Sequence, residues 1–375
     1  MPANQHLTKL TYLFEVAADE EAPARLKAEI LDYLHTEKGL GRVMAALQPL
    51  DAGSDARFEA LASQSRPIAQ ANRVHDILSA FAEELPPNAT LKQALVFARV
   101  AQGHYPSPGR CIYCGATDAE LTDEHVVPFA LTGNAVIFEK ASCRPCAKAI
   151  SPYEQFVLRQ TYGNLRVQID APTRRPKDRK TRIDHPFLLL DERGRTMRKW
   201  TVQTDWDRCP VLCPSWLAPW PTIIDDKPRS AVIHGQKWYY QDQRLSAFID
   251  KTRRFFGSPG VAYEVGKIDG AGFLRFIAKM AHGYAVATRG YDAFDWLTPG
   301  VILGSDPYVS HLVGGSGYVE PADLETGSAI KFDFGDPTPE IPFFLVRIRL
   351  FEFLGTPDQV VVVGRPKGTP VLPDG

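Results

Sequence analysis

Four cysteines, arranged as two Cys-x-x-Cys pairs, surround a single histidine in the middle of the chain. Cys111 and Cys114 lie in CIYCG, Cys143 and Cys146 lie in SCRPC, and Asp123-Glu124-His125 lies between the pairs. Two such pairs supply four thiolates to a tetrahedral Zn²⁺ ion and leave no position open for water. A closed site of this kind is structural, so we expect zinc to fold this segment rather than to act on a substrate.

His125 has the chemistry of a general base. Glu124 directly precedes it, and a neighbouring carboxylate can hold an imidazole neutral and oriented. A carboxylate oxygen can also bind a hard divalent cation. The combination fits phosphodiester hydrolysis, in which His125 activates water and the cation stabilises charge on the phosphate and the leaving oxygen. The residues alone leave a second interpretation open: His125 as a buried, hydrogen-bonded histidine or a spare zinc ligand.

The composition is that of a soluble globular protein, with 375 residues, 44% hydrophobic and 23% charged. A chain of this length has room for about two or three domains. It contains no apolar run long enough to span a membrane, and its N-terminus lacks the pattern of a signal peptide. We therefore expect a cytoplasmic protein without a membrane partner. In that reducing compartment, paired Cys-x-x-Cys motifs favour metal binding over disulfide or redox chemistry.

Three segments differ in pattern, and together they predict an α+β protein. Residues 1–103 are expected to form a helical domain, because EAPARLKAEILDYLHTE and NRVHDILSAFAEEL repeat apolar residues three and four apart. Residues 104–165 contain the cysteine pairs and His125. Residues 166–375 are expected to form an α+β domain of unknown role with antiparallel strands.

The third segment contains specific strand and helix patterns. FLLLDERGRTMRKWTV predicts a hairpin around Glu192-Arg193-Gly194, and LVRIRLF places Arg347 and Arg349 opposite alternating apolar residues. AGFLRFIAKMAHGYAVAT predicts an amphipathic helix. His282 lies off the apolar stripe of this helix, and a core role is favoured for it over a functional one. The apolar stripe comprises Phe273, Ile277, Met280 and Tyr284, and the remaining cysteines, Cys209 and Cys213, are expected to be buried free thiols.

Around its cysteines and histidine the chain resembles the HNH nucleases. The order C-x-x-C, DEHVVPFAL, SCRPC is similar to the zinc-knuckle branch of that family, over about residues 109–160. The resemblance implies a zinc-bound ββα-metal finger and a metal-dependent endonuclease that hydrolyses DNA phosphodiester bonds. It also implies that His125 is the general base and that Glu124 binds the catalytic Mg²⁺ or Mn²⁺ ion.

The chain departs from the family pattern mildly at Glu124, which stands in place of the usual Asp, and more strongly at two further positions. Asn134 stands several residues too early for the middle asparagine, and Ala147 stands where a histidine or asparagine usually follows the last cysteine. Glu154 is the nearest downstream carboxylate that could complete the metal site. However, Ser151-Pro152-Tyr153-Glu154 has the spacing of a capping box, which would assign Glu154 to a helix start. The alternative function is therefore a cleavage-deficient HNH-like zinc protein that binds nucleic acid or acts as a scaffold.

Any contact with DNA, or alternatively RNA, must come from local charge, because the net charge is −1. Basic residues flank both knuckles and begin the run TRRPKDRKTR. The candidates for phosphate contact are Arg110, Arg144, Lys148, Arg159, Arg174 and Arg175. A solvated loop is the competing interpretation of the basic run. Nothing in the pattern indicates a base-reading helix.

Overall fold

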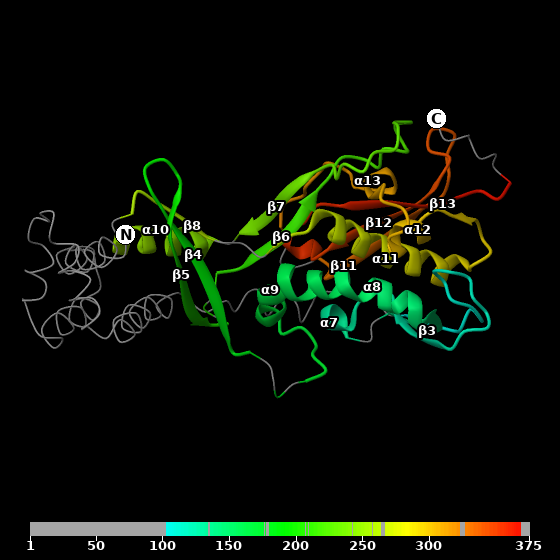
Figure 1. Ribbon diagram of the computed structural model, residues 1–375, viewed down its shortest axis with the longest axis horizontal. Helices are drawn as coiled ribbons and strands as arrows, with labels where there is room; N and C mark the ends of the chain where they lie inside the picture. The colour runs from blue at the N-terminus through cyan, green and yellow to red at the C-terminus, as the bar shows by residue number, and fades with distance from the viewer. Residues whose placement is uncertain are drawn as a thin grey trace, which may run out of the picture. The chain divides into compact units, whose positions relative to one another are not determined.

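The computed structural model describes residues 103–368, except 134–135, 176, 178–179, 207, 209, 242, 257, 264–266 and 323–326. The helical domain expected over residues 1–103 lies outside the described residues, apart from Gly103. The described part mixes helices with largely antiparallel sheets, which confirms the α+β class (Figure 1). Within it, no helix is both long enough and apolar enough to cross a membrane.

The described residues belong to two compact units. The smaller one comes from residues within 181–210 and 242–265, and the larger from residues within 103–180, 211–241 and 267–368. The segment 104–165 with the cysteine pairs therefore shares a unit with much of the C-terminal part of the chain.

The smaller unit is a three-stranded antiparallel sheet with one helix. Its elements are β4 (Arg182–Leu190), β5 (Thr196–Asp205), α10 (Gln243–Phe256) and β8 (Gly260–Tyr263), with strand order β5-β4-β8. The expected hairpin is confirmed as β4 and β5. Its turn is closed by the Asp191 carboxylate, which accepts hydrogen bonds from the backbone N–H groups of Arg193 and Arg195, while Gly194 adopts a φ of +73°.

Every second residue of β4 is buried and contributes to the core of this unit. His185 and Phe187 are fully buried from one face of β4 and pack on Phe248 of α10, with ring centroids 5.9 and 4.9 Å away. The His185 Nδ1 lies 2.8 Å from the Tyr263 hydroxyl oxygen of β8. Burial lowers the pKa of His185 to about 3, so its imidazole is neutral at physiological pH.

The larger unit contains an antiparallel sheet covered by one long helix. The sheet comprises β9 (Asp295–Trp296), β10 (Val313–Gly315), β11 (Ile330–Gly335), β12 (Phe344–Leu350) and β13 (Gln359–Arg365), with order β10-β13-β12-β11 and β9 also on β13. The expected amphipathic helix is α11 (Gly270–Arg289). It contacts β12 and β13 on one side and the helix α8 (Arg144–Phe156) on the other, as Figure 1 shows.

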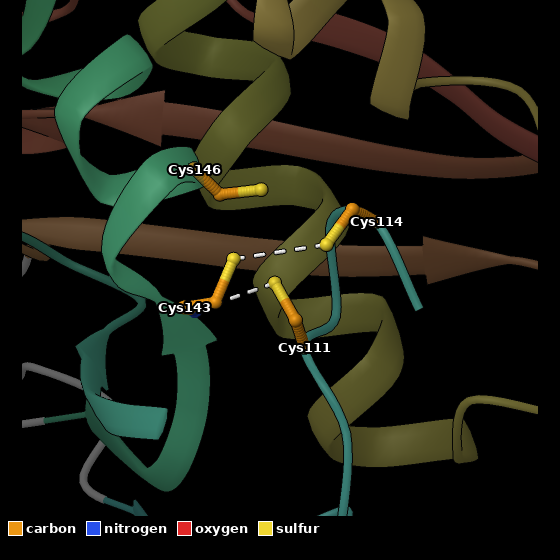
Figure 2. A group of neighbouring side chains, drawn as sticks. All are labelled: Cys111, Cys114, Cys143 and Cys146. Atoms are coloured by element: carbon orange, nitrogen blue, oxygen red, sulfur yellow. Dashed lines mark hydrogen bonds between the residues drawn. The ribbon is translucent and has the colours of Figure 1, made fainter. Parts of the chain in front are cut away.

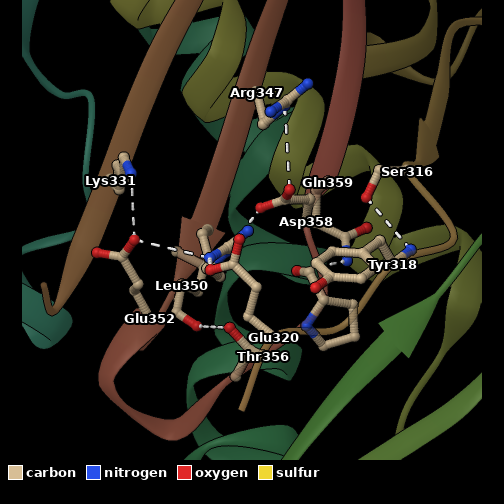
Figure 3. A network of polar contacts seen from close by, with 12 residues as sticks. Ser316, Tyr318, Glu320, Lys331, Arg347, Leu350, Glu352, Thr356, Asp358 and Gln359 are labelled. Atoms are coloured by element: carbon tan, nitrogen blue, oxygen red, sulfur yellow. Dashed lines mark hydrogen bonds and ion pairs between the residues drawn. The ribbon is translucent and has the colours of Figure 1, made fainter. Parts of the chain in front are cut away.

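Arg349 of β12 is buried although it lies on the face opposite the apolar residues. Its Nε donates to Asp358 at 2.6 Å, and its guanidinium also pairs with Glu320 and, at 3.7 Å, with Glu352. Figure 3 labels these three carboxylate residues. Arg347, on the same face, remains exposed. A buried charge requires compensating partners, and these carboxylates provide them. The alternating pattern therefore predicts on which face of β12 Arg349 lies, but it does not predict that Arg349 is buried.

A small sheet followed by helices carries the cysteine pairs. Its strands are β1 (Gly103–Tyr105), β2 (Leu121–His125) and β3 (Val136–Cys143), and they are followed along the chain by α8, the π-helical turn η1 (Val157–Thr161) and α9 (Gly163–Gln168). β2 pairs antiparallel and β1 parallel with β3. Shorter elements of the larger unit are α7 (Phe129–Thr132), β6 (Leu212–Leu217), β7 (Gln236–Gln241), α12 (Pro299–Leu303), α13 (Val309–Leu312) and η3 (Glu352–Leu354).

The capping-box interpretation of Glu154 is wrong. α8 starts at Arg144, with Cys143 as its N-cap residue and a proline in its first turn, and it continues through Pro152. The true start signal is therefore the proline inside the second knuckle, Pro145, which is compatible with a first helical turn. Ser151 lies inside the helix, where its hydroxyl accepts a hydrogen bond from the Gln155 side chain at 2.7 Å. The Glu154 side chain is thus available for a tertiary contact.

Candidate functional site

The four cysteines of the two knuckles converge, as predicted (Figure 2). All four Sγ atoms lie within 4.8 Å of one another, and those of Cys114 and Cys143 are 3.7 Å apart. Zn–S bonds of about 2.3 Å place the sulfurs of a tetrahedral site about 3.8 Å apart. The donor set and its spacing therefore fit one structural zinc ion, for which these thiolates would supply the ligands.

Local backbone geometry explains why each knuckle presents its sulfurs. In the first, Gly115 adopts a φ of +74° and donates its N–H to the Cys111 carbonyl at 2.8 Å, which closes a tight turn. In the second, Cys143 ends β3 and Cys146 lies in the first turn of α8. The Cys143 N–H points at the Cys111 sulfur, 3.4 Å away. Although burial raises the pKa of Cys111, backbone N–H groups lower it below the ordinary value, which favours the thiolate.

His125 lies at the end of β2 and is half-buried. Its ring centroid is 6.2 Å from that of Phe129, in an edge-on arrangement. The Arg174 guanidinium lies 5.4 Å from the centre of the same Phe129 ring. Phe129 therefore has both the candidate base and one of the candidate phosphate-binding residues as neighbours.

Glu124 turns to the opposite side of β2 and is buried, with 8% of its surface exposed. Its Oε1 lies 2.6 Å from Nζ of Lys279 on α11, a lysine that is itself 2% exposed. The same ammonium lies 3.3 Å from Glu154 Oε1 and donates to the backbone carbonyl of His125. The structure thus brings together the two carboxylates singled out as metal ligands, but around a lysine.

Electrostatics keep the Lys279 side chain charged. Burial by itself lowers the pKa of Lys279, but the charges of Glu124 and Glu154 outweigh burial and leave that pKa above the ordinary value. Burial, followed by the charges of the same two carboxylates, raises the pKa values of Tyr113 and Tyr153, so both phenols remain protonated. Lys279 is therefore an ammonium at neutral pH.

These carboxylates do not fit a divalent ion in this arrangement. Mg²⁺ requires free oxygen ligands at about 2.0–2.1 Å, whereas the ammonium of Lys279 occupies that side of Glu124 and Glu154. Ala147, where the resemblance places a further ligand, is a half-buried residue of α8, and Asn134 lies outside the described residues.

α11 contacts the zinc-knuckle segment through residues spaced three and four apart. Lys279 binds β2, His282 binds the Ile112 carbonyl through Nε2 at 2.7 Å, and a Cβ at Gly283 would lie 3.3 Å from Val126. The Thr298 hydroxyl, 2.9 Å from His282 Nδ1, fits as its donor. His282 is fully buried and burial lowers its pKa to about 4, so it is the neutral core histidine that the helix pattern favoured.

The remaining basic candidates lie on several elements. Arg144, Lys148 and Arg159 are exposed on α8 and η1, and Arg175 is exposed beside Arg174. Arg110, by contrast, is half-buried: its guanidinium lies over the Tyr291 ring at 5.0 Å and 4.0 Å from Asp292. Of the two other cysteines, Cys213 is buried as predicted and Cys209 lies outside the described residues.

Sequence reasoning missed Lys279. It stands 154 residues after His125, inside an apolar helix pattern, and no local motif marks it. The one available signal was a charged residue among apolar neighbours in AGFLRFIAKMAHGYAVAT, next to the stripe residue Met280.

Comparisons of this chain with family models, with curated proteins and with solved structures find no match.

Proposed function

We propose that this protein is an HNH-type endonuclease that hydrolyses DNA phosphodiester bonds with His125 as the general base. The observation that carries the proposal is the placement of His125. It ends a strand whose partner, β3, leads directly into the four-thiol cluster and helix α8. The strand–strand–helix order and the cysteine frame are those that the resemblance implies. Zinc would fix this frame and would take no part in the reaction.

The chemistry assigned to His125 is proton transfer. A neutral imidazole nitrogen accepts a proton from water as the water oxygen attacks phosphorus. The phosphorus–oxygen bond to the leaving group then breaks, and the leaving oxygen takes a proton from solvent. Arg174, which shares the Phe129 ring with His125, is the basic residue best placed to attract a phosphate.

A divalent ion, Mg²⁺ or Mn²⁺, is part of this proposal, and its charge would stabilise the leaving oxygen. Since Glu124 and Glu154 both bind Lys279, we expect the ion to arrive with the DNA phosphate rather than to bind the free protein. Mg²⁺ commonly combines few protein ligands with substrate phosphates and water.

A plasmid-nicking assay tests the proposal. Supercoiled DNA is incubated with the full chain, with and without Mg²⁺ or Mn²⁺, and the assay is repeated with a structured RNA. The expected result is nicking that requires the ion and is lost in His125→Ala. The matched control is His104→Ala, which removes an exposed histidine of the same small sheet, 3.4 Å from Glu139. Equal nicking by the parent and His125→Ala would refute the role of His125.

The second candidate is a cleavage-deficient HNH-like zinc protein that binds nucleic acid or acts as a scaffold. The pairing of both carboxylates with Lys279 favours it, together with Ala147 in α8. It predicts binding of DNA or RNA that weakens with salt, and no cleavage by any variant. Binding without cleavage across both metals would select this function over the first.

A further inference from the structure

Lys279 binds three oxygen atoms of the zinc-knuckle segment. They are the carboxylate oxygens of Glu124 and Glu154 and the backbone carbonyl oxygen of His125. An ammonium has three N–H donors, so these three acceptors match its whole donor capacity. Because the side chain is 2% exposed, water has little access to it.

The charges show what this lysine replaces. Glu124, which is buried, and Glu154, which is half-buried, come from different elements, β2 and α8. Two carboxylates that share a site repel one another unless a cation lies between them. In the family that the chain resembles, the cation at the acidic residue before the histidine is a metal ion. Here a side chain of α11 supplies the positive charge.

We propose that Lys279 takes the place of a divalent cation at Glu124 and Glu154 and thereby acts as the positioning residue for His125. The inference depends on the proposed function only for what His125 does, since the contacts of Lys279 stand without it.

Positioning follows from two contacts of α11, one with the backbone carbonyl of His125 and one with the next residue, Val126. Lys279 holds the carbonyl of His125, and Gly283, one turn later on α11, leaves just enough room for Val126. A side chain larger than hydrogen at Gly283 would come within 3.3–3.4 Å of the Val126 methyl groups. The end of β2 is therefore fixed to α11, and the C-terminal part of the larger unit becomes part of the site.

The first experiment measures Mn²⁺ binding to the DNA-free, zinc-loaded full chain by electron paramagnetic resonance. We expect the parent and Glu124→Gln to bind Mn²⁺ equally weakly. Lys279→Ala should gain a Mn²⁺ site, and that site should disappear in Lys279→Ala combined with Glu124→Gln. Binding by the parent that Glu124→Gln abolishes would overturn the proposal, and so would a zinc-loaded Lys279→Ala variant without the new site.

The second experiment tests positioning in a variant without buried charges. Lys279→Met combined with Glu124→Gln and Glu154→Gln removes all three charges at nearly constant volume, so its folding does not depend on an unpaired group. We expect the NMR signal of the His125 imidazole to shift and kcat to fall on the order of tenfold to a hundredfold, with KM nearly unchanged.

Lys279→Arg, with Glu124 and Glu154 unchanged, keeps the positive charge, and its kcat should lie between that of the triple variant and that of the parent. An unchanged His125 signal in the triple variant would overturn the positioning role. The imidazole signal and Mn²⁺ binding can be measured without cleavage. A failure of the positioning role can therefore be told apart from a failure of the proposed function, in which the parent itself would not cleave.

Discussion

Two clusters hold the candidate site together, and they are built on opposite principles. The cysteine cluster collects four identical donors from two short motifs, with Cys111 and Cys143 only 32 residues apart. The Lys279 cluster collects single residues from three elements, with Lys279 and Glu124 of opposite charge. The first cluster can be recognised in the sequence from the spacing of its cysteines, whereas the second forms only when α11 packs on α8. A motif can therefore be recognised from the sequence when its residues lie close together along the chain.

The clusters also differ in energetics. Structural zinc sites in small fingers contribute about 10–16 kcal/mol of apparent binding free energy. A buried ion pair, in contrast, gains little net stability over apolar residues, but removing one partner is costly because a buried charge remains. Zinc should therefore stabilise the fold, while the Lys279 cluster should specify how β2 meets α11.

The largest expected effect is the loss of one thiolate. Cys143→Ser should abolish stoichiometric zinc binding and loosen the knuckle segment, because a three-sulfur site loses much of its affinity. Zinc per chain and the thermal unfolding midpoint are the measurements. Cys213→Ser, which removes a buried thiol outside the cluster, should retain about one zinc per chain. Full zinc occupancy in Cys143→Ser would show that the cluster is not the zinc site.

The second-largest effect is expected when the Lys279 cluster is broken. Lys279→Met alone should lower the free energy of unfolding by about 3–5 kcal/mol, because buried Glu124 and half-buried Glu154 are left without a cation. Urea unfolding of the zinc-loaded protein measures it. The triple variant that also carries Glu124→Gln and Glu154→Gln should recover most of the loss. If the single and triple variants were equally unstable, packing rather than charge would account for the effect.

A third prediction concerns a buried polar residue of the smaller unit, His185. Its pKa is about 3 in the fold and about 6.5 when unfolded, so the unfolded chain binds more protons between these values. Stability is complete above pH 6.5 and should fall by about 2 kcal/mol by pH 5. Hydrogen exchange of β4 amides, corrected for intrinsic rates, should show this loss. His185→Phe should flatten it, and an unaltered pH dependence would contradict the assignment.

The smallest effect is expected for Lys331, a lysine near the surface that serves as a comparison for Lys279. Lys331 lies 3.3 Å from Glu352, and its side chain is 48% exposed. Ion pairs whose lysine reaches solvent are screened by water, and surface pairs contribute at most about 1 kcal/mol. Lys331→Met should therefore change the urea midpoint only slightly, and a loss as large as that of Lys279→Met would show that burial does not distinguish the two lysines.

The sequence predicted those features that depend on neighbours along the chain. The two knuckles, the hairpin at Gly194 and the helix expected over 271–288 follow from spacing, turn chemistry and period, and all of them appear in the structure. The failures arose where tertiary contacts decide. Glu154 reads as a helix cap because Ser151 and Pro152 look like a start, but the earlier proline of the knuckle starts α8.

Long-range pairing was equally out of reach. Glu124 was expected to bind a metal ion because of its neighbour His125, while its actual partner lies on α11. The burial of Arg349 likewise required Asp358 and Glu320, which the alternation in β12 cannot indicate. In each case an acidic or basic side chain of a strand pairs with residues outside that strand.

The most direct test of the account is the rate at which zinc-loaded protein cleaves a labelled DNA duplex under single-turnover conditions with Mg²⁺. We predict cleavage by the parent and by His104→Ala. His125→Ala should be slower by on the order of a hundredfold to ten-thousandfold, the usual contribution of a general base, while its zinc content remains about one per chain. Cleavage by His125→Ala at the parental rate would contradict the account.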